Sequence, residues 1–179
     1  MKQIKLNIGC GDNKIKGFIN IDGFAGVKPD VIHDITQSPL PFKKETVDEI
    51  VFFHCIEHIQ ESLHDRVLGE FFRILKKGGK FIISYPEFLK CVERYKDNFK
   101  GERKFFKATI YGRQSHPGDF HVSLMDTQFF RQILKKIGFK IVKIVEESDS
   151  NPWNTVIYCI KDKRWTTREE LLRAEIFNK

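Results

Sequence analysis

Three short apolar stretches near the start of the chain each end in residues that can bind a ligand. They are residues 5–8, followed by Gly9-Cys10-Gly11; residues 18–21, followed by Asp22; and residues 31–32, followed closely by Asp34. Stretches of this kind predict parallel strands, and in open parallel sheets ligands bind outside the carboxyl ends of the strands. Glycine allows the backbone to come close to a ligand. We therefore expect these strand ends to share one binding site.

The two carboxylates suit a nucleoside. Asp22 can accept hydrogen bonds from both hydroxyls of a ribose, and Asp34 can accept one from the exocyclic amine of an adenine. A dinucleotide fingerprint would need a third glycine at position 14 and an acidic residue about 20 positions further on. Position 14 is Lys14, and Asp22 comes too early. The sequence therefore disfavours a nicotinamide dinucleotide, although an ordinary tight turn at Gly9 and Gly11 stays open.

The elements that must position these residues alternate along the chain. Predicted strands are residues 2–8, 18–21, 30–33, 47–53, 80–85, 139–146 and 153–160. Apolar residues at helical spacing predict a helix capped by Ser62 and ended by Gly78-Gly79, and a second one capped by Asp126 and ended by Gly138. A capping box at residues 166–170 predicts a last helix that reaches Phe177. This alternation of helix and strand indicates a doubly wound α/β sheet.

Composition places the chain among globular proteins of one domain. It has 179 residues, 41% of them hydrophobic, and its 17 phenylalanines are enough for an aromatic core. No apolar run reaches the roughly 18 residues of a membrane span, and no signal peptide is recognised. The four cysteines are scattered, so we expect no disulfide framework and a cytoplasmic location. The net charge of +7 permits an anionic partner but does not require one.

An ordered set of motifs resembles the class I S-adenosylmethionine-dependent methyltransferases. The quoted motifs are Leu6-Asn7-Ile8-Gly9-Cys10-Gly11, Asp22, Asp34, Pro39-Leu40-Pro41-Phe42, Val47-Asp48-Glu49-Ile50-Val51, His54-Cys55-Ile56-Glu57-His58 and Arg73-Ile74-Leu75-Lys76-Lys77-Gly78-Gly79-Lys80. Their order and spacing are similar to small bacterial and phage methyltransferases linked to lipopolysaccharide or other glycan pathways. The resemblance is good over roughly the first 85 residues and looser beyond them.

The resemblance implies a fold, a cofactor and a reaction. The fold would be Rossmann-like, with a mostly parallel seven-stranded sheet and helices on both faces. The chain would be a single domain over residues 1–179, with residues 86–125 as a substrate-cover insertion. S-adenosylmethionine would give its methyl group to a small-molecule or saccharide-linked acceptor, most readily at oxygen, and leave S-adenosylhomocysteine. The cofactor-binding residues would be Gly9, Cys10, Gly11, Asp22, Asp34, Ile35 and His54.

Histidines are the candidates for catalysis, because transfer to a hydroxyl benefits from a base with a pKa near neutrality. His121 is the first candidate for a base or an acceptor contact, followed by His116 and His54. His116 and His121 fall in the predicted substrate cover, and His54 directly follows a predicted strand. Each of them has a structural explanation as an alternative.

A metal site is not predicted. His54-x-x-Glu57-His58 matches an inverted zinc-protease pattern. That chemistry needs both histidines on one helix face and a third ligand. Here His54 directly follows a predicted strand, in the middle of the ordered set of motifs described above.

Two other functions stay open. Aromatic residues interleaved with lysines between Phe88 and Phe120 could bind a nucleic acid. The strand that ends at residue 53 lacks, however, the Pro-Pro-aromatic and Pro-Cys motifs of base-modifying methyltransferases. A non-catalytic S-adenosylmethionine-binding module is the other alternative. The sequence indicates no oligomeric state.

Overall fold

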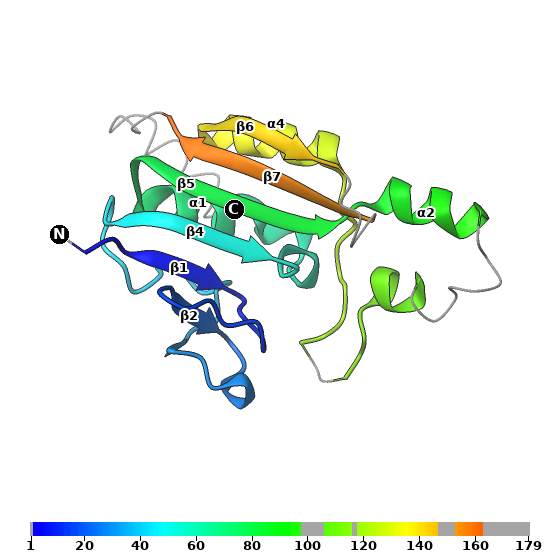
Figure 1. The fold of residues 1–179 in the computed structure, drawn as a ribbon, viewed down its shortest axis with the longest axis horizontal. Helices are drawn as coiled ribbons and strands as arrows, with labels where there is room; N and C mark the ends of the chain where they lie inside the picture. Colours follow the sequence, from blue (N-terminus) through cyan, green and yellow to red (C-terminus); the bar gives the residue numbers. More distant parts are fainter. Residues whose placement is uncertain (1, 98–105, 116–117, 147–152, 163–179) are drawn as a thin grey trace.

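The computed structural model describes residues 2–97, 106–115, 118–146 and 153–162, and it contains one seven-stranded sheet (Figure 1). The strands are β1 (Lys5–Ile8), β2 (Ile19–Asp22), β3 (Val31–Ile32), β4 (Val47–Phe53), β5 (Leu75–Pro86), β6 (Phe139–Val145) and β7 (Asn154–Lys161). Their order across the sheet is β3-β2-β1-β4-β5-β7-β6. The first five strands are parallel, and β7 runs antiparallel to both β5 and β6. The predicted mostly parallel α/β sheet is confirmed.

Helices connect the later strands. They are α1 (His64–Ile74), α2 (Phe88–Asp97), a helical segment at 106–111 and α4 (Thr127–Ile137), with single 3-10 turns η1 (Ala25–Val27), η2 (Ile56–His58) and η3 (Glu61–Leu63). Helices α1 and α4 contact each other and lie behind the sheet as Figure 1 draws it. Helix α2 extends beyond the carboxyl end of β5. The connection from β1 to β2 is short and contains turns only.

Phenylalanines fill the space between α1 and the sheet. Phe71 of α1 lies edge-on to Phe52 of β4, with ring centroids 5.0 Å apart, and also meets Phe81 of β5 at 5.7 Å. Phe72 lies edge-on to Phe139 of β6 at 5.0 Å. Edge-to-face pairs at these separations are favourable beyond their buried area. The aromatic core that the composition predicts therefore holds α1 against the strands that carry the site.

The predicted bounds of the first helix are wrong at both ends. Ser62 lies in η3 and caps no helix, since α1 begins at His64 and has no side-chain cap. At the other end, β5 already begins at Leu75, which pairs with Val47 of β4. Gly78-Gly79 lies within β5, where the register with β4 shifts, rather than after the helix. Early pairing with β4 thus replaces the last turn of the predicted helix.

The second helix is confirmed at both ends. The Asp126 side chain accepts the backbone N–H of Phe129 at 2.8 Å, which is an N-cap contact. Gly138 ends α4 at φ +115°, in the left-handed region that favours glycine. The predicted last helix at 166–177 lies outside the described residues. No helix in the described part of the chain is long and apolar enough to cross a membrane.

Candidate active site

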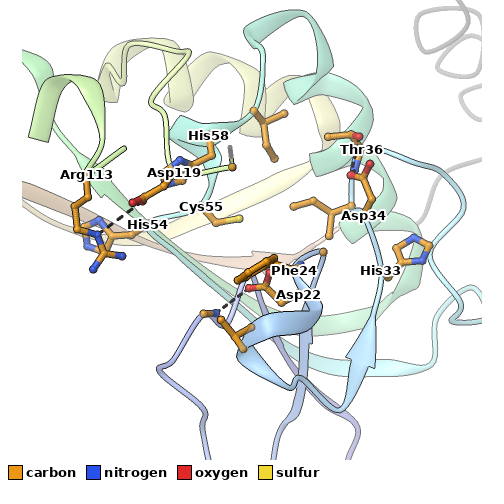
Figure 2. A pocket seen from close by; sticks show the side chains of 17 residues that line it. Asp22, Phe24, His33, Asp34, Thr36, His54, Cys55, His58, Arg113 and Asp119 are labelled. Carbon is orange, nitrogen blue, oxygen red and sulfur yellow. Dashed lines mark hydrogen bonds and ion pairs between the residues drawn. The ribbon is translucent and has the colours of Figure 1, made fainter. Parts of the chain in front are cut away.

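The carboxyl ends of β1 to β5 meet at one edge of the sheet and surround two adjoining cavities. The sheet order reverses between β1 and β4, and a crevice outside the strand ends forms at such a switch point. The first cavity has a volume of about 540 Å³. Figure 2 shows Asp22, Phe24, Asp34 and His58 arranged around it. The predicted convergence of the strand ends is therefore confirmed by the geometry.

The turn after β1 packs directly on the loop after β4. Gly9 has φ +66°, and a Cβ at this position would stand 2.3 Å from the Sγ atom of Cys55. Gly11 has φ +48°, and a Cβ there would meet nothing within 4 Å. Both glycines line the first cavity. The turn is therefore closely packed on its inner side and open toward the cavity at Gly11.

The Asp22 carboxylate is fixed by backbone donors at the end of β2. Its Oδ2 accepts the N–H of Gly11 and its Oδ1 accepts the N–H of Phe24, both at 2.8 Å. Each carboxylate oxygen can accept a second hydrogen bond. The side chain therefore lines the cavity with acceptor capacity left for two hydroxyls of a ligand.

The Asp34 carboxylate lines the same cavity, after β3. Its Oδ1 accepts the backbone N–H of Thr36 at 2.9 Å and the Thr36 hydroxyl at 2.7 Å. Oδ2 accepts only a longer hydrogen bond, 3.3 Å, from Gln37 among the described residues. Partial burial alone would raise the pKa of Asp34, but these hydrogen bonds outweigh it and lower the pKa. Asp34 is thus an ionised acceptor that still has capacity for an amine donor.

Apolar side chains line the first cavity between the two carboxylates. They are Phe24, Val27, Ile35 and Ile59. Sequence patterns identified Ile35 but missed Phe24, Val27 and Ile59, because no motif marks them.

Cys10 differs from its neighbours Gly9 and Gly11, because its side chain is buried and does not line the cavity. Its backbone N–H donates to Ile21 O at 3.1 Å, which ties the turn to β2.

The second cavity has a volume of about 330 Å³ and adjoins the first. Four residues line both cavities: His54, His58, Arg113 and Asp119. The remaining lining of the second cavity is Asn13, Glu57, Pro86, Ala108, Thr109, His121, Trp153 and Asn154. Most of these side chains are polar. The two cavities together form a site with a larger, partly apolar compartment and a smaller, polar one.

His54 stands where the two cavities meet. It has φ +49°, and its backbone N–H donates to Ser84 O of β5 at 3.0 Å. The amide nitrogen Nδ2 of Asn154 donates to its Nε2 at 2.8 Å. This contact leaves the ring proton on Nδ1, 3.4 Å from Glu57 Oε1. His54 thus directly follows β4 and lines both cavities.

His121 enters the second cavity from a tight loop. Its backbone N–H donates to Tyr111 O at 3.2 Å, and the next N–H, from Val122, donates to Glu57 O at 2.9 Å. Gly112 closes this loop at φ +78°, where a Cβ would stand 2.0 Å from Asp119 O. Burial lowers the pKa of His121, so the ring is neutral near pH 7. The third histidine that the sequence singles out, His116, lies outside the described residues.

Comparison with known proteins identifies the family. Residues 6–144 match the family model described as a methyltransferase domain. The chain belongs to the methyltransferase-domain family. Among curated proteins, no sequence matches this methyltransferase.

Solved structures confirm the fold. A SAM-dependent methyltransferase from Methanosarcina mazei has a TM-score of 0.64 at 18% identity, over 90% of this chain and 93% of that one. A SAM-dependent methyltransferase from Archaeoglobus fulgidus has a TM-score of 0.64 at 16% identity, over 89% and 86%. A third is the 1,6-didemethyltoxoflavin-N1-methyltransferase of Burkholderia thailandensis, with bound 1,6-didemethyltoxoflavin and S-adenosylhomocysteine. Its TM-score is 0.59 at 13% identity, over 89% and 71%. The predicted Rossmann-like class I methyltransferase fold is therefore confirmed.

The first cavity fits the cofactor that this assignment implies, S-adenosylmethionine. A volume of about 540 Å³ is in the range of small-molecule sites, roughly 300–1,000 Å³. Gly11 leaves the backbone open to a ligand, and Asp22 and Asp34, at the ends of two neighbouring strands, offer acceptors beside an apolar lining. This arrangement matches a nucleoside, with its hydroxyls at one end and its base at the other.

Proposed function

We propose that this methyltransferase transfers a methyl group from S-adenosylmethionine to an oxygen of a small-molecule or saccharide-linked acceptor. The observation that carries the proposal is the pair of adjoining cavities that share His54, His58, Arg113 and Asp119. One cavity has the size and the polar ends of a nucleoside site, and the other has room for an acceptor. When bound, the cofactor supplies an activated methyl group. The protein then needs mainly to orient the acceptor and to exclude water.

In the first cavity, Asp22 would accept both ribose hydroxyls and Asp34 Oδ2 would accept the exocyclic amine of the adenine. Ile35 and Phe24 would flank the ring. The backbone at Gly9, Cys10 and Gly11 would lie against the methionine part. This turn packs on Cys55, which directly follows His54 at the junction of the two cavities.

The polar lining of the second cavity supports a hydroxyl-rich acceptor. Asn13, Thr109 and Asn154 offer donors and acceptors around it, while Pro86 and Trp153 offer an apolar surface. Sugars present the same mixture of hydroxyls and apolar C–H faces. Residues of the segment 86–125 form one wall of this cavity, which supports its role as a substrate cover.

His121 is the candidate base in this proposal. Its Nδ1 donates to the backbone carbonyl of Thr109 at 2.8 Å, which leaves Nε2 as the acceptor. A neutral imidazole with a free acceptor nitrogen in the acceptor cavity can take the proton of a hydroxyl. His54 would orient the acceptor through its ring at the junction of the cavities.

The experiment is an acceptor screen. The full chain is incubated with S-adenosylmethionine and a panel of nucleotide sugars and saccharide fragments, and mass spectrometry follows the methylated product and S-adenosylhomocysteine. The proposal predicts turnover on a saccharide or another hydroxyl compound, at a much lower rate in Asp22→Asn. Methylation of RNA or DNA instead, with binding that weakens steeply with salt, would contradict the acceptor class.

A further inference from the structure

Three side chains that come from two distant segments meet in the wall of the second cavity. Glu57 and His58 belong to η2, and His121 belongs to the loop that follows the helical segment at 106–111. One possible ligand atom from each residue lies within 4.8 Å of the other two. The His58 and His121 rings are edge-on, with centroids 4.7 Å apart. The fold thus brings two imidazoles and a carboxylate together at one point.

The carboxylate of this cluster lacks a full set of partners. Glu57 is only 1% exposed, yet its Oε2 accepts no hydrogen bond from any residue that the structure describes. Its Oε1 has His54 Nδ1 at 3.4 Å. Burial of a carboxylate oxygen without a donor or a cation is costly. Glu57 thus lines the second cavity and carries a buried oxygen with capacity for a ligand.

Both histidines are oriented in the same way. His58 Nδ1 donates to Phe120 O at 3.0 Å, and His121 Nδ1 donates to Thr109 O at 2.8 Å. A backbone carbonyl cannot donate, so these contacts place the ring proton on Nδ1 and leave a lone pair on Nε2. Metal-binding histidines are commonly held by a backbone carbonyl on their other nitrogen in this way.

We propose that Glu57, His58 and His121 bind a divalent transition-metal ion of the zinc type. Two imidazoles and one carboxylate, with a further position left open, form a ligand set found in catalytic zinc sites. The imidazoles disfavour Mg²⁺ and Ca²⁺, which prefer oxygen ligands. Bonds of about 2.0–2.1 Å to one ion would hold the three ligand atoms well within the 4.8 Å inside which they lie.

The open position would face the second cavity, and there it would hold the acceptor oxygen. This use of the site rests on the proposed function. A bound ion would lower the pKa of the acceptor hydroxyl, so that the hydroxyl could give its proton to water as the methyl group is transferred. His121 would then be a metal ligand, not a base. The sequence pattern was set aside as a metal site because His54 follows a strand. His54 is not part of the cluster in the folded chain, which brings His121 to Glu57 and His58 instead.

The test is calorimetric titration of Zn²⁺ into the full chain after treatment with a chelator. We expect one equivalent to bind, and affinity to fall on the order of 100-fold or more in Glu57→Gln, His58→Gln and His121→Gln. His33→Gln is the matched control, because His33 lies after β3 and contacts Gln37 O on the far side of the first cavity. It should bind Zn²⁺ as the wild type does. Visible spectra of the Co²⁺-substituted wild-type chain should show low-symmetry, four- or five-coordinate ligation.

Absence of stoichiometric Zn²⁺ binding by the wild type would overturn the proposal. A Zn²⁺ affinity in the three variants equal to that of the wild type would also overturn it. S-adenosylmethionine titrated into the same metal-free samples separates this outcome from failure of the proposed function. Cofactor binding without Zn²⁺ binding would reject the metal site alone. Zn²⁺ binding without cofactor binding would reject the methyltransferase proposal and keep the metal site.

Discussion

Asp22 Oδ2 accepts the backbone N–H of Gly11 at 2.8 Å, and this hydrogen bond ties the end of β2 to the turn after β1. The connection between the two strands contains turns only and no helix. The carboxylate therefore does two tasks. It fixes the turn through Gly11, and it keeps acceptor capacity directed into the first cavity.

Replacement of Asp22 by Asn should weaken the binding of S-adenosylmethionine about 10- to 100-fold. Charge-assisted hydrogen bonds to a ligand contribute about 1.5–3 kcal/mol, which corresponds to this range. Calorimetry measures the change. Asp12→Asn is the matched control, because Asp12 is exposed in the same turn and does not line the cavity. Equal affinity in Asp22→Asn and the wild type would reject the ribose assignment.

Replacement of Gly9 by Ala should destabilise the fold by about 2–5 kcal/mol. The left-handed conformation costs an alanine about 1–2 kcal/mol, and the clash with Cys55 adds an overpacking term of about 1–3 kcal/mol. Gly11→Ala carries the conformational cost but no clash, so its free energy of unfolding should fall by about 1–2 kcal/mol. Urea unfolding measures both. The double variant Gly9→Ala/Cys55→Gly should lose less than the sum of the single variants, and strict additivity would show that the contact is absent.

Lys161 stabilises the junction between α1 and β5. Its side chain is 2% exposed, and its Nζ donates to Phe72 O and Leu75 O at 2.8 Å each. We expect Lys161→Met to lower the free energy of unfolding by about 2 kcal/mol, because buried carbonyls without a donor cost about 1–3 kcal/mol. Lys140→Met, on the exposed side of β6, is the control and should change little. A loss as small as that of the control would contradict this role.

Asp48 makes stability depend on pH in the acid range. A hydrogen bond from Lys76 at 2.7 Å and one from the N–H of Ile4 at 2.8 Å lower its pKa below the ordinary 3.8. A depressed folded-state pKa contributes stability above the unfolded pKa, and this contribution is lost as the pH falls through the folded one. The stability difference between wild type and Asp48→Asn should therefore be largest above pH 5 and shrink below about pH 4.

Unfolding by urea at several pH values checks this prediction. Lys76→Met should reduce the same acid dependence, because it removes the first of the two donors. A difference between wild type and Asp48→Asn that stays constant down to pH 3 would contradict the assignment.

Local signals were sufficient for the presence of all seven strands, though not for the start of β5, and for both ends of α4. Asp126 and Gly138 mark both ends of α4, and both act through contacts with their own chain neighbours. The ends of α1 were missed because tertiary pairing decides them. Leu75 pairs with Val47, and the carbonyls at that end of the helix bond to Lys161, which is distant in the sequence. No local pattern could have indicated either contact.

Some residues of the site could likewise be predicted from local sequence signals, and others could not. Asp22 and Asp34 follow strands directly, so the topology predicts their convergence. Phe24 and Ile59 carry no motif, and their place in the lining emerges only from the fold. The meeting of Glu57 with His121 depends on the loop that Gly112 closes, and no sequence pattern indicates the contact of this loop with η2.

Calorimetric titration of the wild-type chain with S-adenosylmethionine and S-adenosylhomocysteine tests the central claim most directly. The first cavity predicts binding of both at micromolar concentrations with one site per chain, because its contacts to ribose and adenine do not involve the transferred methyl group. Binding of neither would contradict the assignment of the first cavity and, with it, the proposed reaction.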